Sequence, residues 1–170
     1  MARRTDEFEL GRLGLSTGEA RRLELHVAVD PLEFGGQRYE AEAGEAPVVL
    51  DLDRTLQGYA LRMRFRARLQ GPCMRCLENA DRTIKVDARE IDQPGEDEEL
   101  NSPYVSGDEL DLRAWAREAL VLALPPKIVC REDCLGLCAE CGQNLNEDPE
   151  HAHERAPDPR WAKLGELRLE

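Results

Sequence analysis

This chain lacks any long hydrophobic run. The longest stretch of consecutive apolar residues runs from Ala119 to Leu124, whereas a membrane-spanning helix needs about 20 residues. The first residues are polar and charged, and no apolar stretch of signal-peptide length follows them. We therefore expect a cytoplasmic protein with no membrane partner. Aromatic residues make up only 5 % of the chain, so its core must consist mainly of Leu, Val, Ala and Ile.

Basic residues are also scarce relative to acidic ones. The chain has 23 Lys and Arg against 35 Asp and Glu, which gives a formal net charge of −12 at pH 7. Affinity for nucleic acid depends largely on the counterions that Lys and Arg displace from phosphates. This composition therefore excludes a general nucleic-acid binder, and contact with RNA would require a local basic patch.

An alternation of apolar and arginine residues gives the clearest secondary-structure signal. From Leu61 to Leu69 every odd position is apolar and every even position is arginine, which is the period of a strand with one buried face. Residues 83–91 repeat the alternation, and Gly71-Pro72 followed by Cys73 lies between the two segments. This order predicts a β-hairpin with cysteines at its tip.

The other segments complete the prediction of an α+β fold, an antiparallel β-sheet with one packed helix, in a single unit of residues 1–170. The expected parts are an irregular lead-in at 1–20, a β-rich core at 21–125 with strands near 23–29 and 47–51, an acidic loop at 92–111, a helix at 111–124, a Cys-rich metal segment at 126–155 and a short helix at 156–170. Asp108 or Asp111 can cap the first helix, and Pro125-Pro126 ends it. Its apolar face consists of Leu112, Trp115, Ala116, Ala119 and Ala123. Asp158-Pro159 indicates the start of the second helix.

The six cysteines occur in three closely spaced pairs, Cys73/Cys76, Cys130/Cys134 and Cys138/Cys141. Two thiolates separated by two residues can bind one tetrahedral ion, because a tight turn points both sulfurs to the same side. Gly142, directly after the last cysteine, permits the left-handed backbone that finishes such a turn. A reducing cytoplasm favours metal ligation over disulfides. We therefore predict one or two bound Zn²⁺ ions.

Structural zinc sites usually take four ligands from two chain segments, so these pairs can combine in three ways. The preferred arrangement has one ion bound by Cys73, Cys76, Cys130 and Cys134, and a second ion bound by Cys138, Cys141, His151 and His153. A zinc-ribbon alternative joins the first pair to Cys138/Cys141 and leaves Cys130/Cys134 free or in a second site. The third alternative closes one site with the four cysteines of residues 130–141 and leaves the first pair without an ion.

The sequence favours a structural role for the metal. A catalytic zinc keeps one coordination position open for water, and four thiolates leave none open. Nothing in the sequence resembles a Ser/His/Asp set, a phosphate-binding Gly loop or a His-x-Glu deaminase motif. We therefore expect no enzymatic activity and no small-molecule substrate.

Four arginines share the polar face of the strand predicted at 61–69: Arg62, Arg64, Arg66 and Arg68. Aligned guanidinium groups can bind phosphates or an acidic protein surface, so they are candidates for contact with RNA or a protein partner. Pairing with acidic residues of neighbouring strands or of the acidic loop is the favoured interpretation, because carboxylates are abundant in this chain.

Several motifs together resemble the YceD family of bacterial and plastid proteins. They are Cys73-x2-Cys76-Leu77, Leu122-Ala-Leu-Pro125, Cys134-Leu-Gly-Leu-Cys138-Ala-Glu-Cys141-Gly-Gln-Asn-Leu-Asn146 and Asp158-Pro-Arg-Trp-Ala-Lys-Leu164. Many family members have Cys-x-Cys where this chain has His151-Ala-His153, which keeps a ligand-competent pair. Some members retain the first cysteine pair and the region of Cys130/Cys134 without the Gly-Leu-Cys string, which implies that these four cysteines belong together.

The resemblance implies a non-enzymatic cytoplasmic factor that supports accumulation of large-subunit ribosomal RNA, with a ribosomal protein or a large-subunit precursor as its partner. The acidic balance favours contact with a basic ribosomal protein. The alternatives are a zinc-stabilised protein-interaction module unrelated to ribosomes and a zinc-dependent hydrolase.

Overall fold

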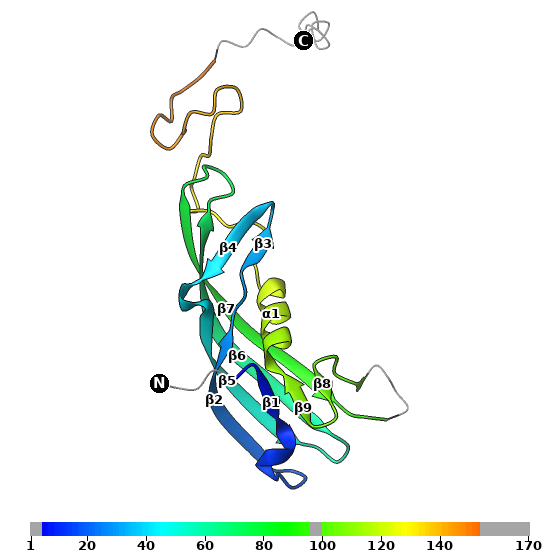
Figure 1. The fold of residues 1–170 in the computed structure, drawn as a ribbon. Coiled ribbons are helices and arrows are strands. Elements are labelled where there is room, and N and C mark those ends of the chain that lie inside the picture. The colour runs from blue at the N-terminus through cyan, green and yellow to red at the C-terminus, as the bar shows by residue number, and fades with distance from the viewer. Residues whose placement is uncertain (1–4, 96–99, 154–170) are drawn as a thin grey trace, which may run out of the picture.

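The computed structural model describes residues 5–95 and 100–153 (Figure 1). Within these ranges six strands form the main sheet: β2 (Ala20–Ala28), β3 (Leu32–Phe34), β4 (Gln37–Ala41), β5 (Glu45–Arg54), β6 (Tyr59–Pro72) and β7 (Asn79–Asp92). β6 lies at the centre and pairs with β7 along one edge. Along its other edge β6 pairs first with β5 and then with β4. All of these pairings are antiparallel, and β2 and β3 continue the sheet beyond β5 and β4.

A smaller sheet and one helix cover one face of the main sheet (Figure 1). The smaller sheet has the order β1-β9-β8 and contains β1 (Glu7–Glu9), β8 (Val105–Ser106) and β9 (Glu109–Asp111). In the described residues the only α-helix is α1 (Leu112–Leu122). This arrangement agrees with the predicted α+β class. No helix among the described residues is long and apolar enough to cross a membrane.

The β6–β7 hairpin forms where the alternation predicts it. Its register runs from Tyr59 opposite Asp92 to Pro72 opposite Asn79, so the turn between the strands carries the first cysteine pair. The apolar residues of β6 are buried, as a strand with one covered face requires; they are Leu61, Met63, Phe65, Ala67 and Leu69. The alternating arginines therefore lie on the opposite face.

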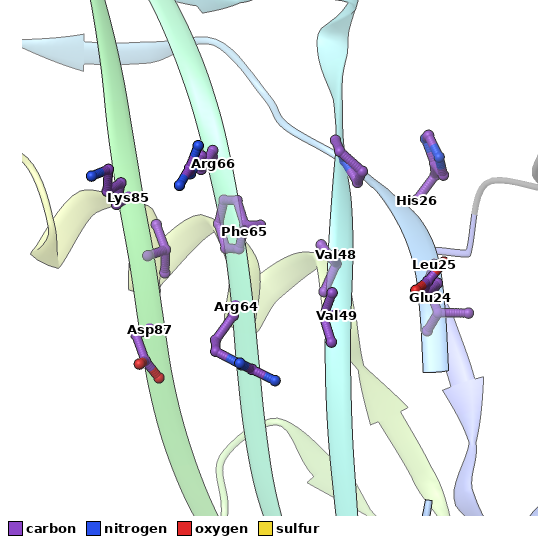
Figure 2. A pocket seen from close by; sticks show the side chains of 12 residues that line it. Glu24, Leu25, His26, Val48, Val49, Arg64, Phe65, Arg66, Lys85 and Asp87 are labelled. Atoms are coloured by element: carbon purple, nitrogen blue, oxygen red, sulfur yellow. The ribbon is translucent and has the colours of Figure 1, made fainter. Parts of the chain in front are cut away.

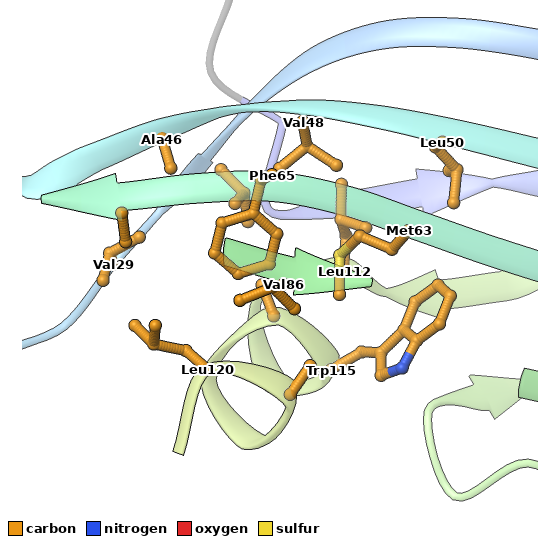
Figure 3. Packing of buried hydrophobic residues seen from close by; sticks show 14 of the residues in the cluster. Val29, Ala46, Val48, Leu50, Met63, Phe65, Val86, Leu112, Trp115 and Leu120 are labelled. Atoms are coloured by element: carbon orange, nitrogen blue, oxygen red, sulfur yellow. The ribbon is translucent and has the colours of Figure 1, made fainter. Parts of the chain in front are cut away.

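The main core lies between the sheet and α1. Phe65 and Val86 of the hairpin pack with Leu112, Trp115 and Leu120 of the helix (Figure 3). The Asp111 side chain caps the helix by accepting a hydrogen bond from the Ala114 backbone N–H at 2.8 Å.

One expected member of the helical face is wrong. Ala123 is the exposed C-cap of α1, and Leu120 is the buried residue in the last turn. The helix ends before Leu124 because a residue that precedes a proline disfavours the helical conformation.

The predicted lead-in at 1–20 is more regular than expected. β1 pairs with β9, and a short 3-10 helix follows at Leu10–Leu13. The Leu10 side chain is buried, and the Leu10 backbone N–H donates to the backbone carbonyl oxygen of Asp108 at 2.7 Å. Leu10 packs in the core together with the partly buried Phe8, Leu13 and Leu15, and this burial orders a segment whose sequence carries only a weak pattern.

The predicted acidic loop at 92–111 is shorter than expected. Asp92 is the last residue of β7 and is buried, and its carboxylate accepts a hydrogen bond from the Ser102 N–H at 3.2 Å. β8 and β9 also lie inside this range. The helix predicted at 156–170 lies outside the described residues.

The β3–β4 hairpin was not predicted, although it supports the cysteine-bearing turn. Gly35 and Gly36 connect its strands with φ of 60° and 74°, which is the left-handed geometry of a two-residue hairpin turn. The buried Tyr39 of β4 donates its hydroxyl hydrogen to the Pro72 oxygen at 2.8 Å. The hairpin therefore fixes the end of β6 next to Cys73.

Candidate metal centres

The first candidate centre joins the tip of the β6–β7 hairpin to the segment that follows α1. It consists of Cys73, Cys76, Cys130 and Cys134, whose sulfur atoms all lie within 4.8 Å of one another. The sulfurs of Cys73 and Cys134 are 3.8 Å apart, and those of Cys76 and Cys130 are 3.6 Å apart. None of the six cysteines forms a disulfide.

These distances fit a single tetrahedral ion. Sulfurs that each lie about 2.3 Å from a zinc ion are about 3.8 Å from one another in tetrahedral geometry. Three of the four cysteines are buried and Cys130 is partly buried, so little of this site is open to solvent. The residues present therefore suit a structural ion.

Two similar turns orient the cysteine pairs Cys73/Cys76 and Cys138/Cys141. The Leu77 N–H donates to the Cys73 oxygen at 3.0 Å, and the Gly142 N–H donates to the Cys138 oxygen at 2.9 Å. Both residues that close these turns have positive φ, 62° at Leu77 and 76° at Gly142. Gly142 was expected to do so, whereas a leucine in this conformation is unusual and carries strain.

A second apolar cluster surrounds the first centre. Ile128 and Val129, which follow α1, are buried against Tyr39 and the ligand cysteines. The Met74 N–H donates to the Ile128 oxygen at 2.9 Å, and the Leu137 N–H donates to the Arg75 oxygen at 3.2 Å. These contacts hold the segment of residues 127–138 beside the hairpin tip.

The thiol pKa values show why this cluster suits a cation. Burial opposes ionisation of Cys73, but backbone N–H groups, including that of Arg75, outweigh burial and lower its pKa to about 6. Burial raises the pKa of Cys76 to about 12. Burial also raises the pKa of Cys130. The Cys73 thiolate is thus favoured without an ion, whereas a positive charge beside Cys76 and Cys130 would favour their ionisation.

The second candidate centre consists of Cys138, Cys141, His151 and His153. The Cys141 sulfur lies 3.2 Å from Nε2 of His151 and 3.3 Å from Nε2 of His153. The two Nε2 atoms are 3.0 Å apart. Backbone N–H groups of Cys141 and Glu140 lower the pKa of Cys138 to about 6. This centre is more exposed than the first.

Carboxylates face the other ring nitrogens of both histidines. Nδ1 of His153 lies 3.5 Å from the Glu140 carboxylate, and Nδ1 of His151 lies 4.0 Å from the Asp148 carboxylate. A histidine that binds metal commonly donates its second N–H to a carboxylate, which fixes the ring and makes it a better ligand. The ring orientations therefore suit metal ligation through Nε2.

Two asparagines connect the surroundings of the two centres. Nδ2 of Asn146 donates to the Cys134 sulfur at 3.5 Å, and Nδ2 of Asn144 donates to the Glu78 carboxylate at 2.8 Å. Glu78 in turn lies 3.9 Å from the Cys76 sulfur. The Asn-Leu-Asn motif thus reaches from the Cys138/Cys141 turn back to the ligands of the first centre.

The structure groups the ligands as in the preferred arrangement of the sequence analysis. Neither the zinc-ribbon pairing nor a single site made from residues 130–141 matches these distances. Asn144, Asn146 and Glu78 are not among the residues that the sequence predicts to be functional. The two asparagines belong to the Cys134–Asn146 motif that carries the family resemblance, and this membership is the sequence signal that could have pointed to them.

Three of the four arginines on the polar face of β6 pair with nearby acids, as the favoured interpretation expects. Arg62 donates to Asp87 through two nitrogens, at 2.8 and 2.6 Å. Arg64 and Arg22 both donate to Asp51 at 2.6 Å. The partners of Arg68 are Asp81 and Glu42. These acids lie on or beside the neighbouring strands and not in the predicted acidic loop.

Comparison with known proteins adds the family to this geometry. A family model described as the large ribosomal RNA subunit accumulation protein YceD matches residues 61–168. The chain belongs to the YceD family. The match includes β6 from Leu61 onward, β7, α1 and all eight candidate ligands. The description of this family refers to accumulation of the large ribosomal RNA subunit.

Relatives in mycobacteria match most of the chain. Uncharacterized proteins of Mycobacterium bovis and Mycobacterium tuberculosis are each 33 % identical over 172 residues, which covers 94 % of this chain and 79 % of the relative. An uncharacterized protein of Mycobacterium leprae is 31 % identical over 131 residues, which covers 72 % of this chain and 59 % of that protein. No solved structure matches the chain.

Proposed function

We propose that this protein is a non-enzymatic, zinc-binding, cytoplasmic factor that supports accumulation of large-subunit ribosomal RNA by contacting a large-subunit precursor or a ribosomal protein. The observation that carries this proposal is the family match across both candidate centres. We propose zinc as the bound ion, because four thiolates, or two thiolates with two imidazoles, are its usual structural ligands.

The role assigned to zinc is structural. Each centre offers four side chains, and a tetrahedral ion bound by all four would have no position left for a reacting water. In the first centre the ion would join the hairpin tip to the chain after α1. It would thereby hold together the surface formed by the hairpin and the Cys-rich segment, which we assign to contact with the precursor.

The experiment replaces the gene in its host with a regulated copy and measures the ratio of large- to small-subunit ribosomal RNA after depletion. We expect the ratio to fall, and we expect wild-type protein to co-sediment with large-subunit precursors. The variant Cys73→Ser/Cys76→Ser should fail to restore the ratio, whereas Arg12→Ala, an exposed substitution on the 3-10 helix at Leu10–Leu13, should restore it. An unchanged ratio after depletion, with the protein absent from precursor fractions, would contradict the proposal and favour a zinc-stabilised interaction module unrelated to ribosomes.

A further inference from the structure

The face of the main sheet that points away from α1 is uncovered in the described residues. A shallow depression of about 790 Å³ lies on this face over β2, β5, β6 and β7 (Figure 2). Its polar rim includes Arg64, Arg66, Lys85 and Asp87. We call the side of the β6–β7 ladder that faces this depression the outer hairpin face. Its cations are Arg62, Arg64, Arg66, Arg68, Lys85 and Arg89.

Two of these cations form a like-charge pair. Arg66 and Lys85 lie directly opposite each other in the β6–β7 register and are both exposed. Neither forms an ion pair with any residue that the structure describes. Like charges at directly opposite positions destabilise a sheet, so this pair weakens the hairpin in the absence of an anion.

The next like-charge pair lies four positions further along each strand. Arg89 is exposed and lies opposite Arg62, and the Arg62 guanidinium is already bound to Asp87 by two hydrogen bonds. Within the described residues Arg89 has no ion pair of its own. Three cations on one face, in a chain with a net charge of −12, thus remain available to an external anion.

The chemistry of this face favours phosphates over stacked bases. Arginine forks match the geometry of phosphate oxygens. Proteins that bind single-stranded bases on a sheet stack them on exposed aromatic side chains, but the aromatic residues of β6, Tyr59 and Phe65, are buried in the core. Contact would therefore be made to the nucleic-acid backbone and would carry little sequence information.

We propose that the outer hairpin face binds the phosphate backbone of RNA, with Arg66 and Lys85 as the main contacts and Arg89 beside them. The choice of RNA over an acidic protein segment rests on the proposed function, in which ribosomal RNA is the molecule whose accumulation depends on this protein. The surrounding acidic surface repels phosphates, so binding is confined to this face and is weak at high salt.

The test measures fluorescence anisotropy of a short labelled RNA hairpin with the zinc-loaded full chain at several salt concentrations. Three phosphate contacts predict a slope of log K against log salt of roughly −2 to −3. The double variant Arg66→Ala/Lys85→Ala should weaken binding at least tenfold and reduce the slope to about −1. The matched control Arg12→Ala/Arg38→Ala removes two exposed cations elsewhere and should bind RNA nearly as well as wild type. Asp87→Asn should strengthen binding, because it removes the carboxylate between the two like-charge pairs.

Several results would overturn the proposal. Wild-type protein with no measurable affinity at low salt would do so, as would equal losses in the double variant and the control. Displacement of the RNA by a Glu-rich peptide at lower concentration than by unlabelled RNA would assign the face to an acidic protein partner instead. Thermal unfolding of both double variants checks that they remain folded. If the chain does not bind RNA through this face but its depletion still lowers the ratio of large- to small-subunit ribosomal RNA, RNA contact by this face is refuted and the proposed function stands.

Discussion

Removal of the metal should release residues 127–138 from the hairpin tip while the main sheet stays folded. Burial of Ile128 and Val129 contributes about 4 kcal/mol together. Four hydrogen bonds join the segment to the hairpin, from Met74 to Ile128, from Arg82 to Val129, from Leu137 to Arg75 and from Arg75 to Cys134, and together they contribute about 4 kcal/mol.

Ordering the segment costs more than these contacts contribute. Roughly twelve residues at about 1.5 kcal/mol each give a cost of about 18 kcal/mol, so the segment lacks about 10 kcal/mol without an ion. A structural zinc ion contributes about 10–16 kcal/mol, which closes this difference. The released form is therefore expected to dominate once the metal is removed.

Amide hydrogen exchange measured by NMR, with a thiol reductant present, provides the assay. The Met74 and Leu137 amides, which donate across the contact, should lose their protection after chelation, whereas amides in the middle of β5 and β6 should keep theirs. In the control His151→Ala/His153→Ala, which alters only the second centre, Met74 should stay protected until the chelator is added. Full protection of Met74 in protein verified to be free of metal would refute the reasoning.

The remaining predictions concern single contacts. Gly71→Ala would place a Cβ atom against the Tyr39 ring and 2.7 Å from the Arg38 backbone oxygen, and it should lower the free energy of unfolding by about 1–3 kcal/mol in urea titrations. Gly95→Ala should not, because among the described residues the nearest atom to its Cβ would be 3.8 Å away. Asp111→Ala removes the helix cap and should cost about 1 kcal/mol, seen as a Tm lower by about 2–4 °C. Hydrogen bonds from Arg22 and Arg64 lower the pKa of Asp51 in the folded chain. The ionised Asp51 therefore contributes to the free energy of unfolding at pH values above the ordinary Asp pKa, and this contribution is lost as the pH falls through the lowered pKa. Asp51→Asn should then lose less stability than wild type between about pH 5 and pH 2; equal losses would show that the two hydrogen bonds contribute nothing.

The long elements could be predicted because their sequences have one buried and one exposed face. The alternation from Leu61 to Leu69 defines the hairpin, and the spacing of Leu112, Trp115 and Ala119 defines the helix, since each pattern reports burial over several residues. Pair spacing and the family resemblance together predict two groups of candidate ligands; the structure brings the same side chains together, and metal binding by them stays a prediction.

Short elements and contacts that depend on register could not be predicted. β1 and β3 have three residues each, too few for a period to be recognised. The alternation from Arg62 to Arg68 is uniform in sequence. Only the folded sheet distinguishes Arg66, which lies opposite Lys85 and has no ion pair among the described residues, from the three arginines that bind acids. The role of Asn146 beside the Cys134 sulfur depends in the same way on tertiary folding.

Metal content of the purified, reduced chain tests the central claim most directly. Elemental analysis should find two zinc ions per chain in the wild type, one in His151→Ala/His153→Ala and one in Cys73→Ser/Cys76→Ser. A wild-type chain without stoichiometric transition metal would contradict the account. So would a Cys73→Ser/Cys76→Ser variant that keeps both ions, because the hairpin tip would then hold no metal.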